Sequence, residues 1–351
     1  MTAETIDEGR YGGWFSELLP SRGYLRVGLV SAGTALGLFA YGYAVAAVGG
    51  LEYLSEPDGY LASFAVLWTL AWLGLADETY VEVWNDVRAA FDVDDDTYRS
   101  VVGAGLDRVY DGRRVLAYAA VFGVPWLFAT AALYVPGSPY RDVVAGLVLE
   151  ADPFAPSYLW LAVFYPYIAV LALSFGAVLN GFVNHLGLVN EVSDLPFRDV
   201  RRAASELESL GRFTLASGAA WFVGATFFVL WQGANLDGTV ALGALGVFVS
   251  VGVVLFLAPQ LVLHDALADA KRDVLAGIRA EYDEMDRLLR ADDPPGDLSL
   301  RLDVTDRRLE GATSIDTWVY DLSSVGKLVA ASVIPWLALV QELVATIRLG
   351  G

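Results

Sequence analysis

Residues 158–183 read YLWLAVFYPYIAVLALSFGAVLNGFV, an apolar stretch without a charged side chain. A helix rises about 1.5 Å per residue, so about 20 such residues cross the roughly 30 Å hydrocarbon core of a membrane. Lipid offers the backbone no hydrogen-bond partners, so this stretch is predicted to be a transmembrane helix. Six other stretches have the same character: residues 27–49, 60–76, 115–135, 213–232, 240–263 and 328–347. The sequence therefore predicts an all-α polytopic membrane protein with seven transmembrane helices.

Two of these stretches are less regular than the others. Residues 60–76 form the shortest of the seven, which suggests support from flanking aromatic side chains or a locally thin bilayer. Residues 328–347 include Glu342, a carboxylate within an otherwise apolar run. An alternative is that this last stretch lies flat on the inner membrane surface, which leaves six spans.

The basic residues indicate the orientation of the chain. All but two of its 23 lysines and arginines lie in the N-terminal arm or after the second, fourth and sixth stretches; the exceptions are Arg141 and Arg348. Lysine and arginine accumulate on the cytoplasmic side, so a cytoplasmic N-terminus and an extracellular C-terminus are predicted in the cell membrane. The predicted parts are a cytoplasmic arm (1–26), a six-span membrane domain with cytoplasmic helical extensions (27–263), a cytoplasmic helical connection (264–327) and the last span with a short outer tail (328–351).

The charge and the cysteine content restrict the class of protein further. The net charge is −19, and the chain has no cysteine, so disulfides and thiolate metal sites are excluded. Clustered carboxylates repel little in molar salt, where the Debye length is about 3 Å, so the acidity is typical of a halophilic archaeon. A surface of this sign also argues against nucleic acid as a partner.

Polar stretches between the spans carry apolar side chains at helical spacing, which predicts a cytoplasmic helical layer. The stripes are Tyr80, Trp84, Val87 and Phe91; Val200, Ala204, Leu207 and Leu210; and Leu267, Val274, Ile278, Met285 and Leu289. They pack either within one subunit or between subunits of an oligomer. Residues 296–314 are polar and predicted to be irregular.

Uncharged polar side chains gather near the inner ends of the fourth and sixth spans. Asn180, Asn184, His185 and Gln260 are candidates for an intramembrane polar or ligand site, because such groups are costly at membrane depth unless they have partners. His264 lies near Gln260, and the two histidines lack a metal-ligand spacing. Hydrogen bonding at the membrane boundary is therefore predicted for them, rather than a metal site shared with Asp265, and no cofactor is expected.

The last predicted span holds the candidates for a pore lining. Ser332, Glu342 and Thr346 fall near one helical face, with Gln341 beside them. Copies of this helix around a symmetry axis would form a ring of carboxylates, an arrangement that selects for cations. The sequence therefore favours a homo-oligomer that conducts monovalent cations.

In its plan of seven spans, an inside N-terminus and a helix-bearing connection before the last span, the chain resembles the insect odorant and gustatory receptor superfamily. The resemblance covers topology only, because the signature motif of that family's last span is absent. It implies a homotetrameric, chemoreceptor-like cation channel with the last helix lining the pore and a small apolar ligand held among the earlier spans. By this resemblance Gln341 is a pore-lining position.

The predicted function is therefore an oligomeric, ligand-gated-like cation channel. Two alternatives stay open: a secondary transporter, and a structural or partner-binding membrane protein that transports nothing. An enzyme is not expected, because the spans contain no aspartate and neither histidine lies deep in the membrane.

Overall fold

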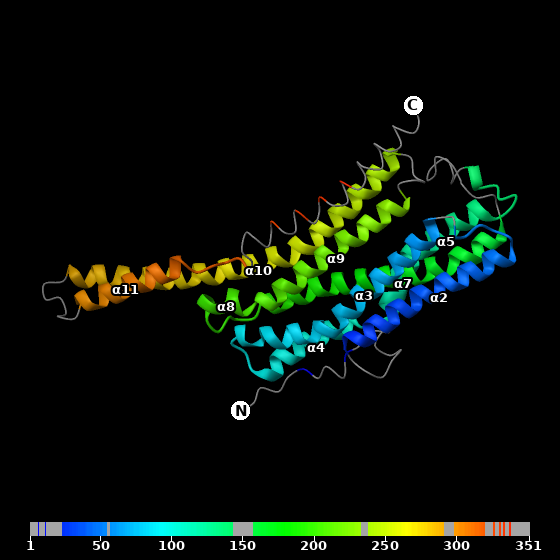
Figure 1. Ribbon diagram of the computed structural model, residues 1–351. Coiled ribbons are helices and arrows are strands. Elements are labelled where there is room, and N and C mark those ends of the chain that lie inside the picture. Colours follow the sequence, from blue (N-terminus) through cyan, green and yellow to red (C-terminus); the bar gives the residue numbers. More distant parts are fainter. Residues whose placement is uncertain are drawn as a thin grey trace.

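The computed structural model describes residues 6, 11, 23–54, 57–142, 157–232, 238–290 and 298–319, together with Gly326, Ala330, Val333 and Leu337. These residues are all-helical and contain no β-strand, apart from an isolated bridge between Phe91 and Phe197. The elements are α2 (Tyr24–Val48), α3 (Pro57–Asp86), η2 (Val87–Ala90), α4 (Asp95–Val109), α5 (Gly112–Tyr134), α7 (Tyr158–Ser193), α8 (Val200–Glu206), α9 (Glu208–Gln232), α10 (Gly238–Leu289) and α11 (Leu298–Thr313) (Figure 1).

Five helices among the described residues are long and apolar enough to cross a membrane. They are Tyr24–Val48, Gly59–Ala90, Gly112–Tyr134, Tyr158–Ser193 and Gly246–Leu289. Each coincides with one of the seven stretches predicted from the sequence, so five of those predictions are confirmed at the level of a helix suited to a membrane. The all-α fold is confirmed for the same residues.

The remaining two predicted spans have different outcomes. Residues 213–232 lie in α9, which is helical but is not among these five. Residues 328–347 fall outside the described residues, except for Ala330, Val333 and Leu337, so this span stays a prediction. Residues 60–76 form the apolar part of α3, which continues as one helix of 30 residues from Pro57 to Asp86, as the layer stripe predicted.

Helix α7 lies at the centre of the bundle and contacts α2, α3, α4, α5 and α10. Its closest approach to α5 is at Gly176, where an added Cβ would lie 2.6 Å from the backbone nitrogen of Ala119 and 2.6 Å from the carbonyl oxygen of Val115. Only a residue without a side chain allows two helix backbones to come this near. Gly176 therefore sets the distance between α5 and α7.

The predicted helical layer forms within one chain. The stripe at the end of α3 is buried together with residues of α4, α7, α9 and α10, and this cluster includes Trp84, Phe91, Tyr98, Leu106, Leu188, Leu207, Leu210, Leu263 and Leu267. We call this cluster the helical layer. Most residues of the three stripes therefore pack within one chain, which was one of the two predicted arrangements, whereas Leu289 at the end of the third stripe is 49% exposed. The side of the membrane on which it lies stays a prediction.

Helix α4 completes the helical layer and was not predicted. Asp94 caps its N-terminus, because the carboxylate accepts hydrogen bonds from the Thr97 amide at 2.7 Å and from the Thr97 hydroxyl at 2.8 Å. These bonds to the charged form hold the pKa of Asp94 below its ordinary value. Tyr98 then enters the layer and donates to the carbonyl oxygen of Trp84 at 2.6 Å.

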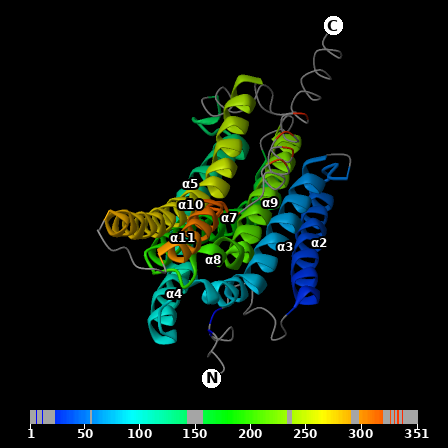
Figure 2. The same ribbon diagram turned by 90° about the vertical axis from the view of Figure 1, so that its left-hand side faces the viewer.

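The far half of α10 forms an arm with α11. Figure 1 shows this half extending beyond the rest of the bundle with α11 alongside it, and Figure 2 places the pair on the opposite side of the molecule from α2. Ile278 packs there with Ala312 and Ile315. Lys271 donates to the carbonyl oxygens of Thr313 and Ile315, both at 2.8 Å.

The prediction of an irregular segment at 296–314 was wrong, because α11 occupies most of it. Leu298, Thr305 and Ala312 are its buried residues, and they are spaced by seven positions, as on one face of a helix. The segment looked irregular because this face contains a threonine and an alanine and is therefore weakly apolar.

Candidate functional site

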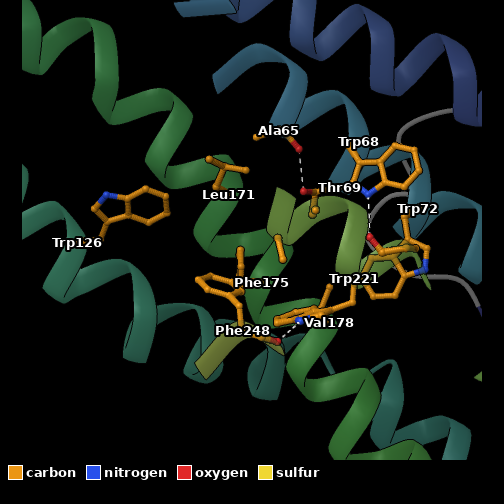
Figure 3. A pocket seen from close by; sticks show the side chains of 13 residues that line it. Ala65, Trp68, Thr69, Trp72, Trp126, Leu171, Phe175, Val178, Trp221 and Phe248 are labelled. Carbon is orange, nitrogen blue, oxygen red and sulfur yellow. Dashed lines mark hydrogen bonds between the residues drawn. The ribbon is translucent and has the colours of Figure 1, made fainter. Parts of the chain in front are cut away.

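A small aromatic pocket lies between α3, α5, α7, α9 and α10, within the apolar part of the bundle. Its volume is about 60 Å³. We call it the tryptophan pocket, because its wall includes Trp68, Trp72, Trp126 and Trp221, together with Phe175, Phe248 and smaller side chains such as Thr69, Leu171 and Val178. Figure 3 shows these side chains arranged around it.

The polar edges of this pocket are already bonded to helix backbones. The indole N–H of Trp68 donates to the carbonyl oxygen of Ala220 at 3.0 Å, and that of Trp221 donates to the carbonyl oxygen of Phe248 at 2.8 Å (Figure 3). The hydroxyl of Thr69 donates to its own helix at 2.7 Å. These groups have their partners, so the tryptophan pocket presents an apolar wall.

A larger cavity adjoins it. This second cavity has a volume of about 190 Å³ and shares Trp72 and Val178 with the tryptophan pocket. We call it the histidine cavity. Its wall consists of Trp72, Leu73, Ala76, Asp77, Tyr80, Val109, Tyr110, Gly112, Val115, Ala177, Val178, Gly181, Phe182, His185, Phe213, Thr214, Ser217 and Leu255. An apolar protein cavity of about 150 Å³ holds a benzene molecule, so the histidine cavity suits a substituted benzene ring.

The wall of the histidine cavity is mostly apolar and aromatic, with a few polar groups. Among the described residues, this wall includes one carboxylate, Asp77, and no lysine or arginine. The hydroxyl of Thr214 is used within α9, because it donates to the carbonyl oxygen of Leu210 at 2.8 Å. An apolar cavity with a small number of placed polar groups is the usual form of a binding site for a small molecule.

His185 is the polar side chain of this wall with an unused hydrogen-bonding atom. It is only 6% exposed, and its Nδ1 lies 2.8 Å from the Tyr80 hydroxyl. Its Nε2 is buried and has no hydrogen-bond partner among the described residues. The rings of Tyr80, Phe213 and Trp84 surround it at centroid distances of 5.5, 5.8 and 6.0 Å. His185, a candidate for an intramembrane polar or ligand site, thus lies in a cavity wall among aromatic rings.

Asn180 and Asn184, two candidates for a ligand site, lie against the end of α4 and away from both cavities. The Asn180 amide donates to the carbonyl oxygens of Arg108 and Val109, at 3.3 and 2.6 Å, and Asn184 donates back to Asn180 at 2.8 Å. Arg114 donates to the side-chain oxygen of Asn184 at 3.1 Å. Neither asparagine belongs to the wall of a cavity described above. Their hydrogen bonds join α7 to the end of α4.

The remaining candidates of the sixth span are separated from the histidine cavity. Gln260 is 1% exposed, and neither polar atom of its side chain has a partner among the described residues, yet it is absent from both cavity walls. His264 stacks on Trp318 with ring centroids 4.0 Å apart, and its Nδ1 lies 3.1 Å from the Thr317 carbonyl oxygen. The two histidines therefore have different neighbours. The pore-lining candidates Ser332, Gln341, Glu342 and Thr346 lie outside the described residues.

Known proteins give no further indication of the function. No protein-family model matches this chain, and no curated protein and no solved structure matches it. The resemblance in plan to the insect chemoreceptors stays a prediction. The function must therefore be argued from the two cavities and from the sequence of the last predicted span.

Sequence reasoning identified one residue of the histidine cavity as a site candidate, His185, and missed the cavity itself. Tyr80 was predicted only as a member of the layer stripe, and Trp72, Phe182 and Phe213 only as parts of apolar stretches. A signal for the site is the density of aromatic residues at the inner ends of three predicted spans. That signal alone does not distinguish a cavity wall from a filled core.

Proposed function

We propose that this chain is a membrane chemoreceptor that binds a small apolar molecule in the histidine cavity. In this proposal the chain assembles into a homo-oligomer, with a tetramer as the expected form, and conducts monovalent cations along its last apolar segment. The N-terminus lies in the cytoplasm and the C-terminus outside the cell. The observation that carries the proposal is a cavity of about 190 Å³ whose wall has five aromatic side chains, Trp72, Tyr80, Tyr110, Phe182 and Phe213.

The position of the histidine cavity supports a receptor. It adjoins the tryptophan pocket at one side, and the helical layer supplies part of its wall through Tyr80. A ligand in the cavity would therefore touch helices of the apolar bundle and of the layer together. A ligand favours one arrangement of a protein when its contacts differ between the arrangements, which is possible where it touches several elements.

The sequence of the last segment supports conduction of cations. Glu342 stands among apolar residues there, and a carboxylate in such a place is paired, protonated or exposed to water. Repetition of Glu342 around an oligomer axis would form an acidic ring, which favours cations over anions. This part of the proposal rests on the sequence alone.

Binding to the cavity is tested with bromobenzene, an apolar molecule that quenches tryptophan fluorescence at short range. Purified protein in detergent is titrated, and the wild type is compared with Gly181→Leu. Gly181 belongs to the cavity wall, and a Cβ there meets no atom within 4 Å, so leucine has space to enter the cavity. We expect saturable quenching in the wild type and a loss of its saturable part in Gly181→Leu.

Gly187→Leu is the matched control for that titration. Gly187 lies on the same helix, also has open space around an added Cβ, and does not belong to the cavity wall. It should quench as the wild type does. Equal titrations of all three proteins would mean that bromobenzene acts only through the detergent, and would overturn binding in the cavity.

Conduction is tested in liposomes loaded with potassium. Protein that binds bromobenzene should release potassium faster when bromobenzene is added, and Glu342→Gln should change the ratio of potassium to sodium flux. A well-folded oligomer that binds the probe molecule but passes no ions would favour a partner-binding membrane protein. Uptake of a substrate against its gradient by a monomer would favour a secondary transporter.

A further inference from the structure

The proposed ligand site contains a hydrogen-bonding atom that the protein itself does not use. His185 belongs to the wall of the histidine cavity, and its ring is bonded on one side only, through Nδ1 to the Tyr80 hydroxyl at 2.8 Å. Its Nε2 is buried without a partner among the described residues. A buried polar atom that stays unpaired destabilises the protein, and a bound molecule with the right group would remove that cost.

Tyr80 decides which kind of group this must be. A phenol donates strongly and accepts weakly, whereas an unprotonated imidazole nitrogen is a good acceptor. In the reverse arrangement the buried Tyr80 proton would need another acceptor, and the Trp84 indole, the other polar group at the Tyr80 hydroxyl, is itself a donor. Tyr80 therefore donates to Nδ1. The hydrogen bond at one imidazole nitrogen sets the protonation of the other, so Nε2 carries the proton and is a donor.

We propose that the ligand of the histidine cavity is a small aromatic or alicyclic molecule with one hydrogen-bond acceptor oxygen, such as a ketone, an aldehyde or an ester. The acceptor oxygen bonds to His185 Nε2–H, and the apolar body lies against the aromatic wall. This inference rests on the proposed function, because it names the chemical class of the ligand for the same cavity.

The class is tested with two pairs of molecules of equal shape. Acetophenone and α-methylstyrene differ in a carbonyl oxygen, which accepts a hydrogen bond, against a methylene group, which does not. Indole and indene differ in an N–H donor against a methylene group. Each molecule is added to purified protein in detergent, and its dissociation constant is obtained from the rise in melting temperature with concentration. The detergent takes up a given molecule to the same extent whichever variant is present. The ratio of the two dissociation constants within a pair can therefore be compared between variants without a correction for detergent.

In the wild type, acetophenone should bind about tenfold more tightly than α-methylstyrene, the factor expected for one hydrogen bond to a buried donor. Any difference between indole and indene should be independent of His185, because Asp77 is the carboxylate acceptor of the wall. In His185→Phe, which keeps a ring but removes both nitrogens, the preference for acetophenone should disappear. His185→Gln should restore part of it, because its amide supplies an N–H near the position of Nε2.

Each other result has a definite meaning. A preference for indole over indene that is lost in His185→Phe would show that Nε2 is an acceptor and would overturn the proposed class. Equal binding within both pairs would overturn it as well, while leaving the cavity as an apolar binding site. If none of the four molecules raises the melting temperature and bromobenzene does not bind, the proposed function fails together with this inference. His185→Gln carries the test alone if His185→Phe does not fold.

Discussion

The side-chain amide of Asn180 donates to the carbonyl oxygen of Val109 across 2.6 Å and thereby caps the last residue of α4 from α7. The final carbonyls of a helix have no partner inside the helix, so each needs one from elsewhere. At the end of α4 this partner is a fully buried amide, which also bonds the carbonyl oxygen of Arg108. Asn180 thus attaches the helical layer to the central helix.

Asn180→Ala should lower the free energy of unfolding by about 1–3 kcal/mol, because it leaves buried carbonyl oxygens unpaired. The change is measured as a shift of the melting temperature, followed by circular dichroism in detergent. Asn190→Ala is the control on the same helix, since Asn190 is exposed, and it should change stability by less than about 0.5 kcal/mol. Equal stability of the two variants would contradict the capping role.

Gly176→Ala should destabilise the bundle by about 1–3 kcal/mol, because an added methyl group meets the backbone of α5 and forces α5 away from α7. Chemical or thermal unfolding in detergent measures the effect. Gly187→Ala, where the added carbon meets no atom within 4 Å, should instead stabilise the helix by up to about 1 kcal/mol. We expect the two substitutions to change the free energy of unfolding in opposite directions. A stabilising Gly176→Ala would contradict the role of Gly176 in the contact with α5.

Lys271→Met should loosen the arm without unfolding the bundle. Its ammonium group bonds two carbonyl oxygens at the end of α11, where the helix dipole is negative. The amides of α11 should therefore exchange with deuterium several times faster in the variant, with little change in α7. Arg272→Met is the control, because the Arg272 side chain is 75% exposed and pairs with Asp269 of its own helix. Unchanged exchange in α11 would mean that apolar packing alone holds the arm.

The absence of cysteine allows the orientation to be tested without a background signal. Single cysteines are introduced at Asp96 and Asp142, both exposed, and at Gly351, and intact cells are treated with a maleimide that does not cross membranes. The predicted orientation makes Asp142→Cys and Gly351→Cys reactive and Asp96→Cys unreactive until the cells are opened. If Gly351→Cys also reacts only after opening, residues 328–347 lie on the inner surface, and conduction along them is excluded.

The net charge of −19 predicts that the protein gains stability in concentrated salt. Repulsion between carboxylates is screened over about 3 Å at 1 M salt and over about 10 Å at 0.1 M. The melting temperature should therefore rise between 0.1 M and 3 M potassium chloride. Sucrose at the same water activity is the control, because it stabilises proteins through its exclusion from their surface without screening charge. It should raise the melting temperature less than the salt does. A melting temperature that does not depend on salt would contradict the halophilic interpretation.

The parts of the fold that were predictable are those with a strong periodic signal. The stripe Tyr80, Trp84, Val87 and Phe91 predicted the extension of α3 into the layer, and these side chains are buried there. Helix α4 was missed because its sequence is polar overall and begins with acidic residues, and α11 because its buried face is short of large apolar residues. In both cases contacts with segments far away in the sequence stabilise a helix that the local composition does not indicate.

The candidate site was predictable only in part, for a related reason. Asn180 and His185 both appeared as polar groups near the inner end of one span, and the sequence cannot separate their roles. Asn180 meets the end of α4, whereas His185 meets Tyr80 and a cavity wall. The difference depends on which helix lies opposite each side chain, and that is a property of the folded chain.

Helix α10 runs for 52 residues, about 78 Å, from Gly238 to Leu289. Phe248 contributes to the tryptophan pocket and Leu255 to the histidine cavity, and Lys271 further along the helix holds the arm. Pro259 lies inside this helix, and Figure 1 shows its two halves running in different directions. Because no loop separates the two halves, a change in the direction of α10 at the cavities would also displace the arm.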